Sequence, residues 1–160
     1  MALIVQKYGG TSVGSTERIG QVADRVAGYL ARGDQVAVVV SAMSGETNRL
    51  VGMGHELGGP AASRREMDVL TSSGEQVTIA LLSIALLQRG IAAKSFLADQ
   101  IALHTDGAHG RARIERIDTE ALRKELADGV VPVIAGFQGV NDQGEIMGGR
   151  GSGADGNATG

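Results

Sequence analysis

Residues 7–14 read KYGGTSVG and stand between a short apolar run, residues 2–6, and a segment with helical periodicity. The adjacent glycines Gly9 and Gly10 can adopt backbone angles closed to other residues and let main-chain N–H groups approach a phosphate. Lys7 adds a mobile positive charge. The stretch predicts an anion-binding turn between a strand and a helix, although such turns also join strands to helices without a ligand.

Two hydroxyl groups, of Thr11 and Ser12, lie in the same turn, and the next helix points its positive end toward it. We predict Ser15 as the N-cap of this helix and Arg32-Gly33 as its end. Its apolar residues recur at steps of three and four: Ile19, Val22, Ala23, Val26, Ala27 and Leu30.

A second hydroxyl-rich segment, residues 41–48, follows a β-branched run at residues 35–40. That run is typical of a parallel strand buried on both faces. Ligands collect at the carboxyl ends of such strands, so we expect Ser41 and its neighbours to lie beside the first turn. The alternative is a capped turn into the next helix, with Ser44 or Thr47 as the N-cap.

Two helices are predicted next, one over residues 50–57 and one from Ser63 or Arg64. We expect residues 71–76 to interrupt the second helix, and the apolar segment 77–88 to be enclosed by protein. Glu75 would then lie at a helix N-terminus, where a carboxylate either complements the helix dipole or holds an ammonium group.

The remaining pattern also alternates strand and helix, which predicts an α/β fold: a mostly parallel sheet with helices on both faces. The predicted segments are a strand at 91–97, a loop at 98–113, a strand at 112–117, a helix at 118–128 capped by Asp118, a strand at 130–137 and a hairpin turn at 141–144.

Composition excludes several classes of function. The chain has 160 residues, 42% of them hydrophobic, and a net charge of −3, which gives no electrostatic case for nucleic acid. It has no cysteine, and its three histidines lack metal-ligand spacing, so we predict no protein metal site and a cytoplasmic location. The most apolar stretch, residues 77–87, is shorter than the roughly 20 residues that cross a bilayer, so we predict no membrane span.

Four motifs in this order, over residues 1–147, resemble the N-terminal part of the catalytic domain of bacterial aspartokinases, in the amino-acid kinase family. They are KYGGTS at 7–12, SAMSG at 41–45, SGE at 73–75 and GFQG at 136–139. The resemblance implies the amino-acid kinase fold and ATP-dependent phosphorylation of the L-aspartate side chain, the first step toward lysine, threonine and methionine.

The resemblance also implies roles for individual residues, and it implies ATP with Mg²⁺ ligated mainly by phosphates and water. Catalytic roles fall to Lys7 and Arg150. The aspartate pocket comprises Ser41, Thr47, Glu75, Phe137 and Arg150. The phosphate-binding residues are Lys7, Gly9, Gly10, Thr11 and Ser12.

The chain departs from the family pattern near its end. The family motif GRGGSD is replaced by GRGSGADG at residues 149–156, which displaces Ser152 and Asp155 from the expected positions. We expect residues 148–160, a glycine-rich tail, to be poorly ordered. The family's nucleotide-binding half and regulatory domains do not follow, so we expect little turnover and no feedback inhibition from these residues alone.

The parent enzymes imply a homo-oligomer, and an uncovered side of the sheet would favour self-association of this chain. Other interpretations stay open at this point. They are a non-catalytic aspartate-binding or regulatory module, a structural fragment without a ligand, and a kinase of the same fold for glutamate, carbamate or uridylate.

Overall fold

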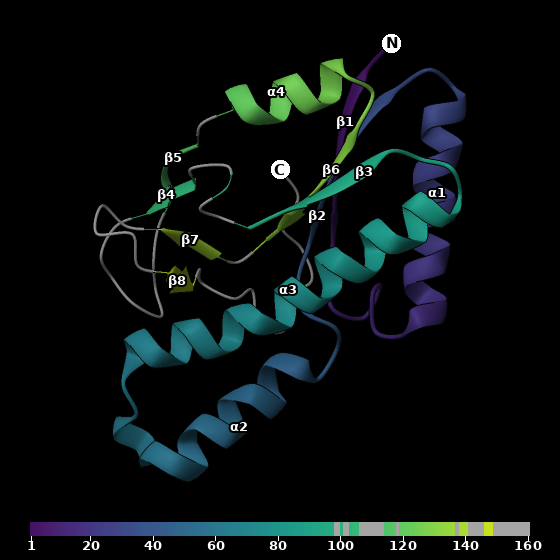
Figure 1. Ribbon diagram of the computed structural model, residues 1–160. Helices are drawn as coiled ribbons and strands as arrows, with labels where there is room; N and C mark the ends of the chain where they lie inside the picture. The colour runs from purple at the N-terminus through teal and green to yellow at the C-terminus, as the bar shows by residue number, and fades with distance from the viewer. Residues whose placement is uncertain are drawn as a thin grey trace.

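A four-stranded parallel sheet forms the centre of the molecule (Figure 1). The structure is a computed structural model and describes residues 1–97, 100, 103–105, 114–117, 119–136, 138–140 and 146–148. The strand order is β1-β2-β6-β3, and each neighbouring pair is parallel. The strands are β1 (Leu3–Tyr8), β2 (Gln35–Val40), β6 (Val131–Ala135) and β3 (Ala93–Phe96). The predicted parallel α/β sheet is confirmed.

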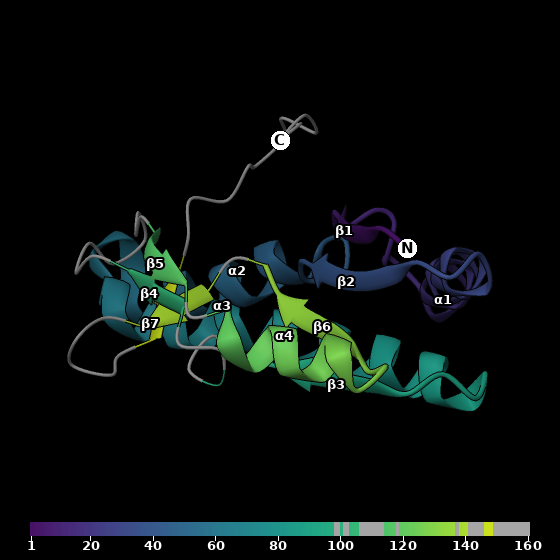
Figure 2. The same cartoon turned by 90° about the horizontal axis from the view of Figure 1, so that it is seen from above.

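Helices cover both faces of this sheet (Figure 2). On one face α1 and α3 pack against each other and against β2, and on the other face α4 packs against β2 and β6. The helices are α1 (Thr16–Ala31), α2 (Glu46–Gly58), the 3₁₀ turn η1 (Gly59–Ala61), α3 (Arg64–Gln88) and α4 (Glu120–Ala127).

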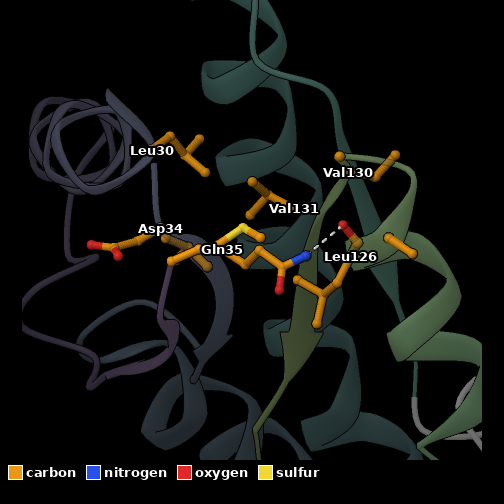
Figure 3. Close-up of a pocket in the computed structure, with 10 residues that line it drawn as sticks. Leu30, Asp34, Gln35, Leu126, Val130 and Val131 are labelled. Atoms are coloured by element: carbon orange, nitrogen blue, oxygen red, sulfur yellow. Dashed lines mark hydrogen bonds between the residues drawn. The ribbon is translucent and has the colours of Figure 1, made fainter. Parts of the chain in front are cut away.

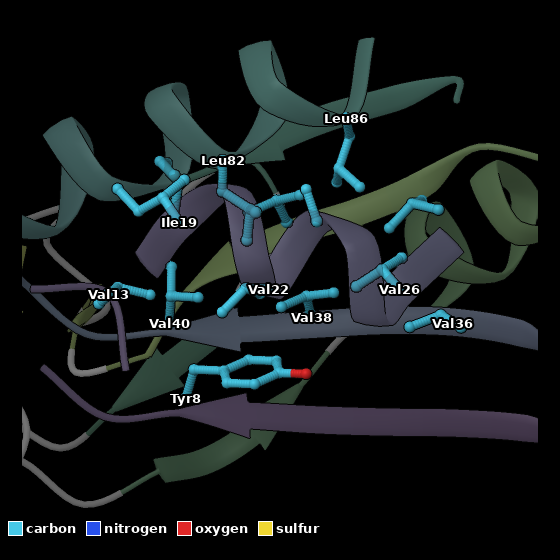
Figure 4. Close-up of a cluster of buried hydrophobic side chains, with 14 of the residues drawn as sticks. Tyr8, Val13, Ile19, Val22, Val26, Val36, Val38, Val40, Leu82 and Leu86 are labelled. Atoms are coloured by element: carbon cyan, nitrogen blue, oxygen red, sulfur yellow. The ribbon is translucent and has the colours of Figure 1, made fainter. Parts of the chain in front are cut away.

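The main core lies between the sheet and the pair α1 and α3, and it is almost entirely aliphatic (Figure 4). Leu82 and Leu86 of α3 are fully buried against the valines of α1 and β2. A smaller cluster on the other face joins Phe96 and Ile134, with Leu122 of α4 packed against it. Burial of these side chains holds the sheet and its helices together.

A second, small sheet has the order β5-β4-β7-β8. Its strands are β4 (Leu103–Thr105), β5 (Ile114–Ile117), β7 (Gln138–Val140) and β8 (Ile146–Gly148). β7 and β8 pair antiparallel, with Val140 opposite Ile146, as the predicted hairpin requires. β4 falls inside the segment predicted to be a loop, so that part of the prediction was wrong. β8 lies against α3.

The ends of α1 confirm the sequence pattern, and the start of α2 does not. The Ser15 side chain caps α1 by accepting the N–H of Arg18 at 3.2 Å. α2 begins after Gly45, which has φ of 81°, and no side chain caps it. The prediction of Ser44 or Thr47 as the cap was therefore wrong, because a glycine in the left-handed region makes the turn instead.

α3 runs without a break through the segment expected to interrupt it. The hydroxyl groups of Thr71, Ser72 and Ser73 donate to carbonyl oxygens three or four residues earlier, at 3.0, 2.7 and 2.6 Å. Hydroxyls bonded in this way remain compatible with a helix. Glu75 consequently lies in the middle of α3, and its interpretation as a helix N-terminal acid was wrong.

Only part of the surface of α3 is enclosed, contrary to the prediction for residues 77–88. Val77, Ile84 and Leu87 are exposed on the face turned away from the core. At 25 residues, with an 18-residue window of mean hydropathy 1.4, α3 is long and apolar enough by length and composition to cross a membrane. The prediction of no membrane span considered only residues 77–87, which are a part of this helix. The packing of α3 on the sheet and on α1 is that of a core helix.

Three predictions toward the C-terminus lie outside the described residues. They are the cap at Asp118, the hairpin turn at 141–144 and the tail at 148–160 except Gly148, which ends β8. Thr119 occupies the N-cap position of α4 and makes no capping bond through its side chain.

The Leu82→Ala substitution tests the main core. Leu82 is fully buried, so we expect the free energy of unfolding to fall by about 2–5 kcal/mol in urea titrations followed by circular dichroism. Leu57→Ala is the control, because Leu57 is 93% exposed on α2. Equal losses for the two variants would contradict this assignment of the core.

Candidate functional site

Three strands of the parallel sheet end at the same level, and the candidate site lies at this edge. Tyr8 of β1 is in register with Val40 of β2, and Val40 is in register with Ala135 of β6. The segments that follow these strands therefore begin at one rim of the sheet. Two of these segments are residues 9–15, after β1, and residues 41–45, after β2. This is the carboxyl edge of the sheet, where open α/β proteins bind their ligands.

Hydrogen bonds join the first two loops directly. The Ser41 N–H and hydroxyl both donate to the Tyr8 carbonyl, at 3.2 and 3.4 Å. The Ser44 N–H donates to the Gly10 carbonyl at 3.0 Å, and the Gly136 N–H donates to the Val40 carbonyl at 2.9 Å. The prediction that the second hydroxyl-rich loop lies beside the first is confirmed.

The turn of residues 9–14 presents main-chain donors ahead of α1. The Ser12 N–H donates to the Gly9 carbonyl at 3.1 Å, which closes the turn. The N–H groups of Gly10 and Thr11 have no hydrogen-bond acceptor among the described residues. Free N–H groups beside the N-terminus of a helix of 16 residues favour an anion.

The glycine pair does not work in the way the sequence suggested. Neither Gly9 nor Gly10 has a positive φ, so the expectation of special backbone angles was wrong. Gly10 is required by close packing, because a Cβ there would lie 3.0 Å from the Ala42 carbonyl oxygen and 3.3 Å from the Ser44 nitrogen. A Cβ at Gly9 would meet nothing within 4 Å, so open space lies beside this residue.

Another glycine brings α3 to the same loop. A Cβ at Gly74 would lie 3.0 Å from the Ala42 Cβ and 3.5 Å from the Glu46 Cγ. The next residue, Glu75, is only 4% exposed, so it is buried beside this contact. The structure therefore places Gly74, next to Glu75, against the loop that carries Ser41 and against Glu46, which precedes Thr47 in the first turn of α2.

The cationic and aromatic residues at the end of β1 occupy opposite faces of the sheet. Tyr8 is buried in the core, so Lys7 projects from the other face and is exposed. The Tyr8 hydroxyl donates to the Gln6 Oε1 at 2.8 Å, and burial raises the pKa of this phenol. The phenol is therefore neutral at physiological pH. Its burial in the core anchors the end of β1 at the residue next to Lys7.

Thr47 is exposed in the first turn of α2, close to an ion pair. Arg49 donates to both oxygens of Glu46, and this bidentate bond holds the pKa of the Glu46 carboxyl below its ordinary value. The carboxylate of Glu46 is therefore engaged by Arg49, whereas the Thr47 side chain next to it is exposed.

Sequence analysis missed one buried carboxylate. Asp68 is 5% exposed and lies seven residues before Glu75, on the same face of α3. The spacing of seven residues between Asp68 and Glu75 could have indicated a shared helix face. The sequence analysis did not use it, because a helix break was expected at residues 71–76. Phe137 and Arg150 lie outside the described residues, and so do the displaced Ser152 and Asp155.

A separate hollow of about 290 Å³ opens at the opposite, amino edge of the sheet (Figure 3). Leu30, Leu126 and Val131 line it, and the side-chain amide of Gln35 donates to the Leu126 carbonyl at 3.0 Å. None of the predicted site residues lines this hollow. The candidate site therefore stays at the carboxyl edge.

Comparison with known proteins agrees with this geometry. The family model described as "Amino acid kinase family" matches residues 2–155. The chain belongs to the amino acid kinase family. Among relatives of this amino acid kinase chain, the aspartokinase of Pseudomonas aeruginosa is 56% identical over 146 residues, and that of Thermus thermophilus is 50% identical over 146 residues. Each alignment covers 91% of this chain and 35% or 36% of the relative, so the chain spans about a third of their length.

Solved structures of aspartokinases share the fold of this amino acid kinase chain. The aspartate kinase from Synechocystis has a TM-score of 0.72 at 44% identity, covering 86% of this chain and 22% of that one. E. coli aspartokinase III, solved in complex with aspartate and ADP, has a TM-score of 0.80 at 22% identity, covering 92% of this chain and 43% of that one. At this lower identity the second likeness concerns the fold alone.

The glycine pair offers a matched test of the loop packing. We expect Gly10→Ala to lower the free energy of unfolding by about 1–3 kcal/mol, because its Cβ would press on main-chain atoms that cannot yield cheaply. Gly9→Ala should change it by less than about 0.5 kcal/mol, since space is open there. Urea unfolding measures both variants, and a larger loss for Gly9→Ala would contradict the geometry.

Proposed function

We propose that this chain forms the aspartate- and phosphate-binding part of an aspartate kinase, which transfers the terminal phosphoryl group of ATP to the side-chain carboxylate of L-aspartate. The observation that carries the proposal is the close approach of the turn at 9–12, through Gly10, and of α3, through Gly74 next to Glu75, to Ala42 in the loop 41–45 at the carboxyl edge of the sheet. The similarity of the chain to aspartokinases at 50% and 56% identity supports this choice among amino acid kinases.

The first turn suits the phosphate end of the substrate pair. The N–H groups of Gly10 and Thr11, the open space at Gly9 and the N-terminus of α1 form a cradle for an anion. The hydroxyl of Ser12 and the ammonium of Lys7 complete the set that the resemblance predicts. These residues would hold the transferred phosphoryl group and neutralise its charge.

The other residues suit an amino acid. Glu75 brings a carboxylate into the largely buried side of the site, where a charge-assisted hydrogen bond to the ammonium group of aspartate would be strong. Ser41 and Thr47 would donate hydroxyl hydrogen bonds to the substrate. By the resemblance, Arg150 would bind a substrate carboxylate and Phe137 would line the pocket.

The chemistry requires positioning and charge neutralisation more than proton transfer. The side-chain carboxylate of aspartate is already a nucleophile, so no general base is needed as its oxygen forms a bond to the terminal phosphorus. The bond from that phosphorus to the bridging oxygen breaks, and ADP carries away the electron pair. The product is 4-phospho-L-aspartate.

ATP supplies the phosphoryl group, and Mg²⁺ would offset the charge of its phosphates. Among the described residues no group of three or more His, Cys, Asp or Glu side chains could hold a metal ion. By the resemblance, the cation would be bound mainly by phosphate oxygens and water, as Mg²⁺ prefers.

The proposal extends to the setting of the enzyme. We place the reaction at the first step toward lysine, threonine and methionine, in the cytoplasm, and we expect the enzyme to be a homo-oligomer. The net charge of −3 supports small-molecule substrates over nucleic acid.

The Glu75→Gln substitution tests the aspartate pocket. We expect isothermal titration with L-aspartate to show at least a tenfold loss of affinity, because a neutral amide no longer pairs with the ammonium group, and a charged hydrogen bond is worth about 1.5–3 kcal/mol. Glu66→Gln is the control, an exposed acid on the same helix. Unchanged aspartate affinity in Glu75→Gln would overturn the assignment.

The Lys7→Met substitution tests the phosphate end. We expect the affinity for MgATP, measured by isothermal titration, to fall about three- to tenfold, because one exposed positive charge is removed. Lys94→Met is the matched control on β3, at the far edge of the sheet, where Lys94 pairs with Glu125 at 3.4 Å. An equal effect of the two variants would show that Lys7 has no specific role.

A further inference from the structure

The hollow at the amino edge of the parallel sheet is large enough for a small organic molecule (Figure 3). Its volume is about 290 Å³. A cavity of ~150 Å³ holds benzene, so this one has room for about twelve non-hydrogen atoms. Most of its lining side chains are apolar, Leu30, Leu126 and Val131 among them. Met1 also lines it but is 95% exposed, so this residue remains in water and does not close the hollow.

Two helices end beside the hollow in the same way. After α1, the N–H groups of Gly33 and Asp34 donate to carbonyl groups of the last turn, at 3.0 and 3.3 Å. After α4, the N–H groups of Gly129 and Val130 do the same, at 3.1 and 2.9 Å. Both glycines have a positive φ, 87° and 77°, as Schellman turns require. The negative ends of two helix dipoles therefore flank the hollow.

The ionisable side chain that lines the hollow is also negative. It is Asp34, which makes one hydrogen bond, accepting the Ala2 N–H through Oδ1 at 3.2 Å. The two cations nearby do not line the hollow. Lys124 is exposed in the last turn of α4, and the guanidinium of Arg32 lies 5.2 Å from the centre of an aromatic ring of α1. The lining thus favours a positively charged ligand over a negative one.

Hydrogen-bond acceptors remain in the hollow after its donors are used. The main-chain N–H groups of Gln35 and Val131 donate to the carbonyls of Ala2 and Ala92, both at 2.8 Å. The Gln35 side chain lies among the lining residues in Figure 3 and donates through Nε2 to the Leu126 carbonyl at 3.0 Å. No described residue donates to its Oε1. A ligand with donors and no acceptor would match this arrangement.

We propose that the hollow binds a small primary amine with an apolar body. The ammonium group, with three donors, lies near the Gln35 Oε1 and the Asp34 carboxylate, and the apolar body packs against Leu30 and Leu126. Asp34 is only half-buried, so an ammonium group beside it keeps part of its water and loses little hydration free energy. The hollow lies at the edge opposite the candidate site, so this inference does not rest on the proposed function.

Isothermal titration of the 160-residue chain with phenethylamine at neutral pH tests the ligand class. A compound of about nine non-hydrogen atoms should bind with a dissociation constant on the order of 1 mM. We expect phenethyl alcohol and phenylacetate to bind at least about fivefold more weakly, because the first lacks the charge and the second carries the opposite one. Equal binding of the alcohol and the amine, or no binding at about 10 mM amine, would overturn the inference.

NMR spectra of the ¹⁵N-labelled chain test the location, because an amine could also be held at Glu75. We expect the amine to shift the N–H signals of Gly33 and Gly129 and to leave those of Gly10 and Thr11 unchanged, with or without an excess of L-aspartate. Shifts confined to the carboxyl edge, or shifts at Gly33 and Gly129 that L-aspartate abolishes, would contradict a separate site.

Two variants test the residues of the hollow. Leu30→Phe fills part of it and should weaken the amine at least about fivefold, whereas Leu57→Phe, a matched change at an exposed leucine, should not. Asp34→Asn should weaken the amine about threefold and leave the binding of phenethyl alcohol unchanged, which a merely structural effect would not do. Circular dichroism shows whether the variants fold. Unchanged amine affinity in Asp34→Asn, or in a folded Leu30→Phe chain, would overturn the assignment.

Discussion

Two glycines close on Ala42, and the arrangement of the candidate site depends on this contact. Gly10 brings the first turn against the Ala42 carbonyl, and Gly74 brings α3 against the Ala42 methyl group. A side chain at either glycine would meet atoms at about 3.0 Å, which a close-packed interior does not accommodate without displacement. Three segments far apart in the sequence are thereby held at one rim of the sheet, and the position of Glu75 follows from that of its neighbour.

α3 connects the parts of the molecule that matter for function. The C-terminal half of its inner face supplies Leu82 and Leu86 to the aliphatic core, and the N-terminal half carries the buried acids Asp68 and Glu75. Its outer face exposes Val77, Ile84 and Leu87. Because α3 is one continuous helix, its packing in the core also fixes the position of Glu75.

The composition of the site matches the chemistry proposed for it. Phosphoryl transfer to a carboxylate needs oriented donors and positive charge, and the chain presents main-chain N–H groups at Gly10 and Thr11, a helix N-terminus and Lys7. It offers no cysteine nucleophile. Membership of the amino acid kinase family and this geometry therefore both support the proposed phosphoryl transfer, and they rest on different observations.

Local patterns determined the four parallel strands and α1 correctly, because hydrophobic period, a serine cap and β-branched runs act over a few residues. Ser15 capped α1 and residues 35–40 formed β2 as the sequence indicated. Tertiary packing decided the rest. It kept α3 continuous through three hydroxyl residues and buried Asp68 on the same helix face as Glu75. It also requires glycine at position 10 because of close packing, and not because of a special backbone angle. These outcomes depend on neighbours distant in the sequence, whose approach no short window contains.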